Sequence, residues 1–178
     1  TNRQPVATKM NFNADGTIQP IVLSAKGVGA LRKDPRYVIP NLALGKRAIV
    51  SSTLPENRIP PIADPTLNRI ETFAAANALD GSNGSRWMAT ESDPNPRFQV
   101  DLGSVREIRR TQLFFVRPTS GHAYQLESSV DGKEWQTYGG NAEVGIRSPH
   151  LDETPAKARY LRLTILKGVA GLWEFGVY

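Results

Sequence analysis

An acidic turn between Asn77 and Trp87 contains the residues best suited to chemistry. Asp80 begins this turn, and three more oxygen-bearing side chains follow within five residues, namely Ser82, Asn83 and Ser85. Closely spaced carboxylate, hydroxyl and carbonyl oxygens are the ligands that a hard cation such as Ca²⁺ requires. The same residues also fit an ordinary Asp-Gly turn in which serine side chains cap backbone groups. The spacing alone therefore leaves a cation site and a capped turn as alternatives.

A second polar pair, Arg117 and His122, brackets the loop that follows an apolar segment. Arginine offers a rigid fork of donors, and neutral imidazole offers one donor and one acceptor, which together match vicinal sugar hydroxyls. The alternative is that His122 bonds to a loop carbonyl group and that Arg117 is solvated. The pair is thus a candidate sugar site with a structural alternative.

Catalytic groups are weakly indicated. Glu91 and Asp93 lie in a polar loop and raise the question of a glycosidase acid and base. No apolar neighbours are present to raise one pKa, so both carboxylates are expected to be solvated. The histidines are His122 and His150, and no Gly-x-Ser-x-Gly segment accompanies them. With zero cysteines, disulfides, thiolate catalysis and thiolate zinc sites are excluded.

The three tryptophans divide into two groups. Trp87 and Trp135 flank turns in strand segments, where large aromatic side chains are usually buried, so both are expected in the core. Trp173 follows the glycine-rich segment 167–172, and stacking on a sugar and core packing are equally compatible with that position.

The net charge of +5 is concentrated near the N-terminus. Residues 1–40 hold six basic and two acidic side chains, whereas the remaining 138 residues hold 16 basic and 15 acidic ones. A protein that neutralises phosphates concentrates basic residues on its folded part, so nucleic acid is not the expected partner. No window approaches the apolar run needed to cross a bilayer.

Short, evenly spaced strand patterns from residue 41 onward predict a β-sandwich. Apolar residues alternate with polar ones over 97–102 and 160–165, and further strands are expected at 108–116, 124–130 and 134–138. One helical turn is expected at 73–79, and the prolines within 58–65 predict a surface loop. Near the N-terminus, residues 13–16 predict a hairpin turn between segments 6–12 and 17–22.

Four segments in register resemble one family, the discoidin or coagulation-factor C-type domain, and in particular the family-32 carbohydrate-binding modules. They are the acidic turn, Ser129 to Trp135, Ala158 to Leu163 and Leu172 to Tyr178. The resemblance covers residues 41–178 and implies an all-β, jelly-roll β-sandwich of the galactose-binding-domain-like kind, with an N-terminal hairpin appendage. A short second resemblance, over residues 3–30, is to the C-terminal end of a family-43 glycoside hydrolase. Residues 1–38 are accordingly expected to be the end of a preceding catalytic domain plus a linker, and residues 39–178 the module.

The family resemblance implies a structural cation, Ca²⁺, that ties the last strand to the acidic turn. Its ligands would be the side chains of Asp80, Ser82, Ser85 and Glu174 and the carbonyl groups of Asn77 and Trp173. Ser82 departs from the Asn or Asp that is more usual at its position.

The resemblance also implies that the chain is a non-catalytic module that targets a parent glycoside hydrolase to glycan. The expected sugar site combines Arg117 and His122 with Trp173 and an outer contact from Glu91 or Asp93, although the family more often has Asn where His122 stands. The alternative is a discoidin domain that binds a protein partner or a membrane surface. The candidate loop tips are polar and proline-rich, so membrane insertion is not expected. We expect a monomer that is secreted, periplasmic or on a bacterial cell surface.

Overall fold

A computed structural model of the chain describes residues 11–20, 39–59 and 69–178. The chain divides into two compact units, Thr1–Ile39 and Pro40–Tyr178, and each is considered by itself. This division lies one residue after the boundary that the sequence predicts. The assignment of residues 1–38 to the end of a catalytic domain stays a prediction.

The described part of the first unit is a tight hairpin. Phe12 forms a β-bridge with Ile18, and the Asn13 amide donates to the Thr17 carbonyl at 2.8 Å. The Asp15 carboxylate accepts from both the backbone amide and the hydroxyl of Thr17 and so fixes the turn. The turn predicted at 13–16 is therefore present. The expected strand residues 6–10 and 21–22 lie outside the described residues.

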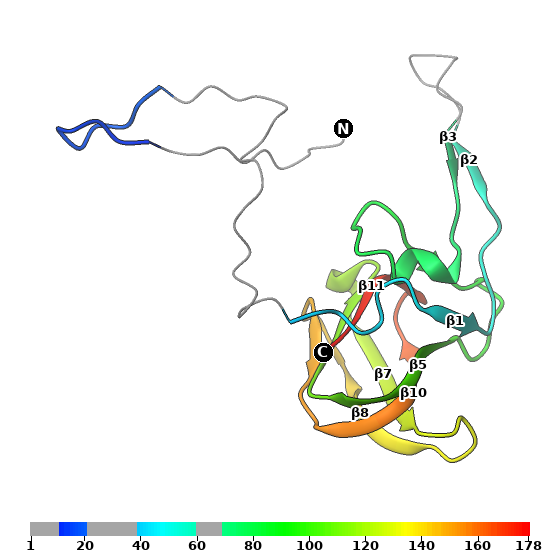
Figure 1. The fold of residues 1–178 in the computed structure, drawn as a ribbon. Coiled ribbons are helices and arrows are strands. Elements are labelled where there is room, and N and C mark those ends of the chain that lie inside the picture. The colour runs from blue at the N-terminus through cyan, green and yellow to red at the C-terminus, as the bar shows by residue number, and fades with distance from the viewer. Residues whose placement is uncertain (1–10, 21–38, 60–68) are drawn as a thin grey trace. The chain divides into compact units, whose positions relative to one another are not determined.

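The second unit is a sandwich of two antiparallel sheets (Figure 1), which confirms the predicted fold class. The five-stranded sheet has the order β1 (Arg47–Val50), β5 (Arg97–Ile108), β10 (Ala156–Lys167), β7 (His122–Ser129) and β8 (Gln136–Gly145). The four-stranded sheet has the order β4 (Trp87–Met88), β11 (Gly171–Val177), β6 (Thr111–Phe115) and β9 (His150–Asp152). A small separate hairpin joins β2 (Asn57–Ile59) to β3 (Arg69–Glu71), and two 3-10 turns are η2 (Ala75–Ala78) and η3 (Pro118–Ser120).

The core lies between the two main sheets and follows the predicted alternation. On β5 and β10, every second residue points inward and is buried, namely Phe98, Val100, Leu102, Leu161, Leu163 and Ile165. Trp87 is fully buried and packs edge-on against Phe98, with ring centroids 5.2 Å apart. Its predicted place in the core is confirmed.

The prediction that Trp135 lies in the core is wrong, because this side chain is only partly buried. It precedes β8, and the guanidinium group of Arg162 lies 3.9 Å from the centre of its ring. Arg162 is on the outer face of β10 and is held there by the Glu127 carboxylate at 2.9 Å. The indole is therefore covered by an ion pair on the sheet surface rather than by core side chains.

Strand boundaries differ from the predictions where the C-terminus intervenes. The strand expected over 108–116 is interrupted, because the amides of Arg109 and Arg110 both donate to the Tyr178 carbonyl. The helical turn expected at 73–79 is η2, and η3 is an additional turn. Asn57–Ile59 is a strand of the small hairpin, so the start of the predicted loop 58–65 is wrong, and residues 60–65 lie outside the described part. No helix among the described residues is long and apolar enough to cross a membrane.

Candidate functional site

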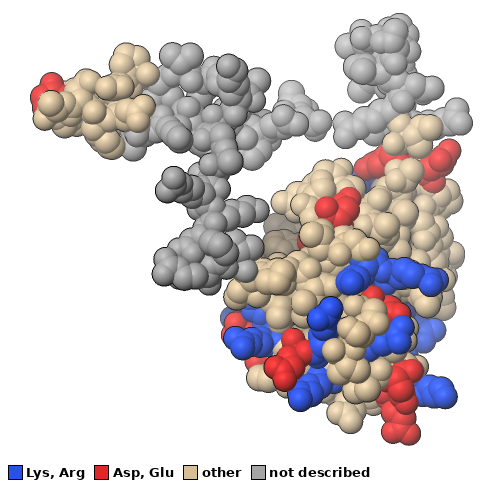
Figure 2. Space-filling model, in the orientation of Figure 1, with Lys and Arg blue, Asp and Glu red and all other residues tan. Residues whose placement is uncertain are grey.

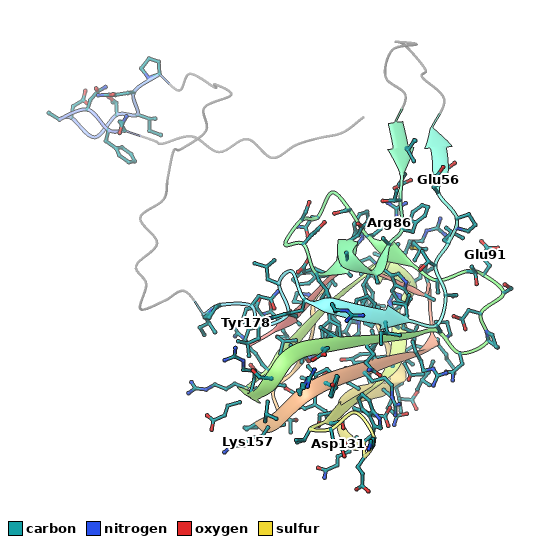
Figure 3. The ribbon with its side chains drawn as sticks, turned by 45° about the vertical axis from the view of Figure 1, so that its right-hand side comes forward. Glu56, Arg86, Glu91, Asp131, Lys157 and Tyr178 are labelled. Carbon is teal, nitrogen blue, oxygen red and sulfur yellow. The ribbon has the colours of Figure 1, made fainter. Side chains whose placement is uncertain are left out.

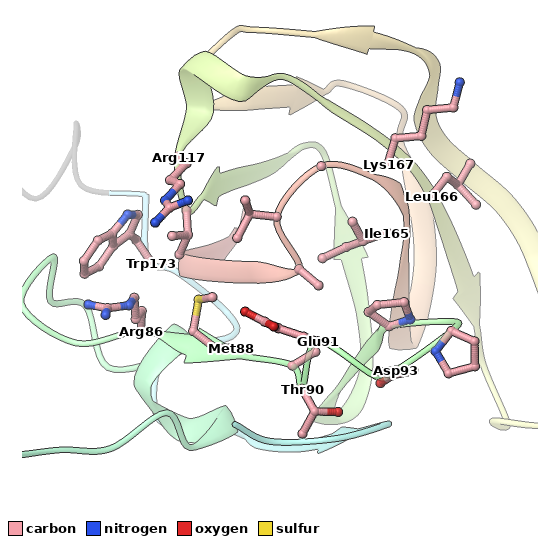
Figure 4. Close-up of a pocket in the computed structure, with 17 residues that line it drawn as sticks. Arg86, Met88, Thr90, Glu91, Asp93, Arg117, Ile165, Leu166, Lys167 and Trp173 are labelled. Carbon is pink, nitrogen blue, oxygen red and sulfur yellow. The ribbon is translucent and has the colours of Figure 1, made fainter. Parts of the chain in front are cut away.

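A pocket of about 720 Å³ opens at one end of the sandwich, where three loops meet (Figure 4). It is lined by residues of β4 and the loop after it, of the β6–η3 junction, and of the connection between β10 and β11. These loops carry most of the residues of the sugar site that the family resemblance implies. Four of the five predicted sugar-binding residues line this pocket, namely Glu91, Asp93, Arg117 and Trp173.

Backbone hydrogen bonds hold the three loops together. The amide of Val116 donates to the Gly171 carbonyl at 3.0 Å, and the amide of Ala89 donates to the Ala170 carbonyl at 2.9 Å. Gly171 is required for this close approach, because a Cβ there would lie 2.8 Å from the carbonyl oxygen of Trp87. The pocket is thus built on an extension of the four-stranded sheet, which fixes its walls.

Arg117 has a strained backbone. Among the described residues it is the one non-glycine with a positive φ, at 53°. A left-handed conformation costs a non-glycine residue about 1–3 kcal/mol, and such strain tends to occur at functional positions. The conformation lets Pro118 begin η3 while the Arg117 side chain remains exposed at the pocket.

Trp173 forms one wall of the pocket because β11 bulges at this residue. Leu172 pairs with Phe115 and Glu174 with Phe114, so Trp173 is the extra residue on its strand. A bulge redirects a side chain relative to its sheet. The indole is partly exposed and stacks on Arg86, whose guanidinium carbon lies 4.9 Å from its ring centre (Figure 4).

Arg86, which the sequence reasoning missed, is held on three sides. Its guanidinium carbon is also 5.0 Å from the ring centre of Phe73, and its Nη1 lies 2.6 Å from the carboxylate of Glu71. A guanidinium group over an aromatic face is favoured electrostatically. One face of Trp173 is therefore backed by a fixed cation. No local sequence pattern connects residue 86 with residue 173, so the pairing had no signal in the sequence.

The two loop carboxylates play different parts. Asp93 accepts hydrogen bonds from the hydroxyls of Ser51 and Ser52 and from the Asn95 amide, and these bonds hold its pKa below the usual value, with the Ser51 bond the largest cause. Asp93 therefore ties its loop to the end of β1 while it stays partly exposed, and its pKa is not raised as a catalytic acid would require. Glu91 is exposed at the pocket and offers a carboxylate to a ligand (Figure 4).

The prediction that His122 binds sugar is wrong, because its side chain is fully buried. The ring stacks on Phe115 with centroids 4.3 Å apart, and its Nε2 donates to the Val169 carbonyl at 3.1 Å. This is the structural alternative that the sequence allowed for His122. The residue supports the 168–173 loop from behind and does not reach a bound sugar.

The buried histidines predict a loss of stability in acid. Burial is the largest cause that lowers the pKa of both His122 and His150. Below the ordinary value of 6.5, the unfolded chain binds protons that the folded chain binds only at lower pH, so the free energy of unfolding falls as the pH drops. Thermal melting with saturating calcium is expected to show this fall, and His122→Phe is expected to make it shallower. An identical pH dependence in the variant would contradict the prediction.

The predicted cation site brings the acidic turn and β11 together. The Gly81 amide donates to the Glu174 carboxylate at 3.2 Å, and the Ser82 amide and Ser85 hydroxyl donate to the two oxygens of Asp80. Asn41, which the sequence reasoning missed, lies with its side-chain nitrogen 3.5 Å from the Glu174 carboxylate. Among the described residues no three acidic or histidine side chains cluster for a metal, so a cation here would also need hydroxyl and carbonyl oxygens.

The electrostatics of Glu174 fit a cation. Burial, and to a smaller extent the nearby charge of Asp80, raise the pKa of Glu174 to about 7. A partly buried carboxylate beside another negative charge is unfavourable unless it is protonated or meets a counter-charge. A cation bound between the turn and the last strand would provide this counter-charge for Asp80 and Glu174.

Charge elsewhere on the second unit is mixed. Basic and acidic side chains are interspersed on the face shown in Figure 2. This distribution agrees with the nearly balanced charge of residues 41–178 and gives no broad basic surface on that face.

The two-sheet antiparallel sandwich with a loop pocket at one end defines the class of discoidin-like β-sandwich domains. The sequence of residues 65–175 matches the F5/8 type C domain family. The chain therefore belongs to this family, and its second unit shares the fold of solved modules of the family-32 carbohydrate-binding kind. No curated protein matches the sequence.

The chain is similar to part of a solved enzyme and to separately solved modules. A glycoside hydrolase is 44% identical, with a TM-score of 0.77, over 96% of this chain and 38% of its own length. The chain therefore spans less than half of that hydrolase. Chitosan-binding module 1 of a chitosanase/glucanase from Paenibacillus sp. IK-5 is 26% identical, with a TM-score of 0.61, over 79% of this chain and 99% of its own. A Clostridium perfringens module in complex with GalNAc-β-1,3-galactose, 19% identical over 75% of this chain and 95% of its own with a TM-score of 0.59, shares the fold.

Proposed function

We propose that the second unit binds glycan in the loop pocket and thereby holds a parent glycoside hydrolase on its substrate. The observation that carries this proposal is the convergence of Arg117, Glu91 and the partly exposed indole of Trp173 on one pocket. The guanidinium group can donate to sugar hydroxyls, the carboxylate can accept from them, and the indole can cover an apolar sugar face. Related modules with names that record chitosan binding and a bound galactose disaccharide support the same ligand class.

The fragment's place in a larger enzyme is part of the proposal. The hydrolase match extends over nearly all of this chain, including residues before the module, which supports residues 1–38 as the end of a preceding catalytic domain. A module of this kind acts where polysaccharide or glycoconjugate is found, so we place the parent enzyme outside the cytoplasm, either secreted, periplasmic or on the cell surface. An open pocket with a polar lining is expected to bind sugar weakly, with a dissociation constant of about 0.1–1 mM.

Arg117→Ala tests the proposal at its most exposed polar contact. Losing a good hydrogen-bonding partner is expected to cost about 1–3 kcal/mol of binding free energy, or roughly 5- to 150-fold in affinity. Calorimetric titration with oligosaccharides of galactose, N-acetylglucosamine, arabinose and xylose measures the loss. Arg106→Ala is the matched control, because Arg106 is exposed on β5 and does not line the pocket. Equal binding by both variants would show that the sugar lies elsewhere.

We also propose that a structural calcium ion is held by the side chains of Asp80, Ser82, Ser85 and Glu174 with the carbonyl groups of Asn77 and Trp173. Its support is the raised pKa of Glu174 and the hydrogen bond that already joins Glu174 to the acidic turn. The ion would supply the positive charge that two neighbouring carboxylates lack. Its role is to attach β11 to the turn, which in turn steadies Trp173.

A further inference from the structure

A second pocket, of about 310 Å³, lies on the outer face of the five-stranded sheet. Its floor is formed by residues that are paired across neighbouring strands. Arg47 pairs with Asp101, Asp101 with Tyr160, and Ile49 with Gln99. The turn between β7 and β8 adds a wall made of Asp131 and Gly132. Its volume is at the lower end of the range for small-molecule sites.

The pocket walls are fixed by contacts within the protein. Arg159 makes a two-pronged pair with Asp101, at 2.8 and 2.9 Å, and its guanidinium carbon lies 4.9 Å from the ring centre of Tyr160. Gly132 has a φ of 76°, and a Cβ there would lie 3.3 Å from the Tyr160 ring. The ring orientation of Tyr160 is therefore set by Arg159 and by the closeness of the turn, and little ordering would be needed on binding.

Several polar groups in this pocket have unused hydrogen-bonding capacity within the described structure. Asp131 accepts from the amides of Lys133 and Glu134 and from the Ser129 hydroxyl, and all three bonds go to Oδ1, which leaves Oδ2 open. The Gln99 amide and the Tyr160 hydroxyl make no side-chain hydrogen bond to another described residue and are partly buried. Beside them Ile49 is 66% exposed, an apolar surface next to open donors and acceptors.

We propose that this sheet pocket is a second glycan-binding site, for a neutral pyranose unit, separate from the loop pocket. The apolar surface of Ile49 and the Tyr160 ring suits the C–H face of a sugar, and Asp131 Oδ2 with the Gln99 amide suits vicinal hydroxyls. Asp101 and Arg159 neutralise each other, which leaves Arg47 opposite Asp131. With one charge of each sign, the pocket favours neither an acidic nor an amino sugar.

The two pockets lie at different parts of the module. Figure 3 shows Asp131 well separated from Arg86 and Glu91, which line the loop pocket. Among the residues that the structure describes, none lines both pockets. Binding at the sheet pocket can therefore be measured independently, whether or not the loop pocket binds sugar.

Nuclear magnetic resonance titration of the isotope-labelled chain tests the proposal. The probes are neutral oligosaccharides of galactose, N-acetylglucosamine and xylose, with glucosamine and galacturonate trisaccharides as charged counterparts, all at millimolar concentrations. We expect a neutral sugar to shift the backbone amides of Gln99, Gly132 and Tyr160 in a saturable way, and the shifts to persist in Arg117→Ala.

Asp131→Asn and Gln99→Ala are each expected to lower the apparent affinity for the neutral sugar, as measured from these shifts, at least tenfold. Asp131→Asn keeps an oxygen for the turn amides while altering Oδ2, so the turn should stay folded. Gln125→Ala is the matched control. Gln125 lies on β7, is exposed on the same outer face of the five-stranded sheet, and does not line the pocket. Absence of shifts at this face with every neutral sugar would overturn the proposal, as would stronger binding of a charged trisaccharide or equal loss in Gln125→Ala.

Discussion

Removing calcium is expected to lower the melting temperature of the module by about 10 °C, which corresponds to the roughly 2.7 kcal/mol that a ligand at a hundred times its dissociation constant contributes. The reason is the Glu174 carboxylate, which is partly buried beside Asp80. Without a cation, these two groups repel each other across the contact between β11 and the acidic turn. Calorimetric melting of dialysed protein, with and without added calcium, measures the difference.

The pH dependence separates a cation from other sources of stability. Burial raises the pKa of Glu174 to about 7, against 4.5 in the unfolded chain, so the metal-free folded state binds an extra proton between these values. The metal-free module therefore gains stability from Glu174 as the pH falls through 7, whereas calcium must displace that proton and binds more weakly. The calcium effect is expected to be largest above pH 7 and to fade toward pH 5.

Glu174→Gln is expected to abolish the response to calcium. Glu143→Gln is the matched control, because Glu143 is exposed on β8 and makes no described contact with the turn. The cation proposal would be contradicted if calcium left the melting temperature of the parent chain unchanged. It would also be contradicted if calcium still raised the melting temperature of Glu174→Gln.

Trp173→Ala is expected to lower sugar affinity in the loop pocket by about thirtyfold, or about 2 kcal/mol, as is typical for a central aromatic contact. The indole is a rigid surface backed by Arg86, so a sugar loses its apolar partner without any replacement. Trp173→Tyr keeps an aromatic face and is expected to retain part of the affinity. Titration with the oligosaccharide that binds the parent chain best gives the comparison.

Trp135→Ala is the matched control for this prediction. Trp135 is also a partly exposed tryptophan stacked on an arginine, in this case Arg162, but it lies outside the loop pocket. We expect its loss to leave sugar binding in the loop pocket unchanged. Equal effects of the two substitutions would mean that binding depends on general stability rather than on stacking at Trp173. The backbone carbonyl of residue 173 is kept in both variants, so calcium binding provides a check that the turn is intact.

The alternation of apolar and polar residues was sufficient to predict a sandwich, because it shows which side chains of β5 and β10 point inward. The grouping of the pocket loops came from the family resemblance, because only a known strand order says which loops share an edge of the sandwich. Side-chain direction was less predictable. His122 points inward because β7 begins at that residue and Phe115 offers a flat partner, neither of which the spacing between Arg117 and His122 reveals.

Long-range partners explain the remaining differences. Asp93 is a partly exposed loop carboxylate, and Ser51 and Ser52, more than 40 residues earlier, supply hydrogen bonds that its place in the sequence does not reveal. Trp135 appeared to be a core residue, yet an arginine on β10 covers it from outside. Each partner comes from a distant part of the chain, and a chain position says nothing about such a neighbour until the strand order is known.

The bulge in β11 has a thermodynamic consequence. It places consecutive residues in two sites, with the Trp173 indole in the loop pocket and the Glu174 carboxylate at the acidic turn. A cation that fixes the backbone at Glu174 would also lower the entropy that a sugar must remove to order the adjoining backbone of Trp173. Linkage then requires the reverse, because whatever factor calcium adds to sugar affinity, sugar adds to calcium affinity. Through one inserted residue, the proposed ion would act as a cooperative co-ligand of a glycan that it never touches.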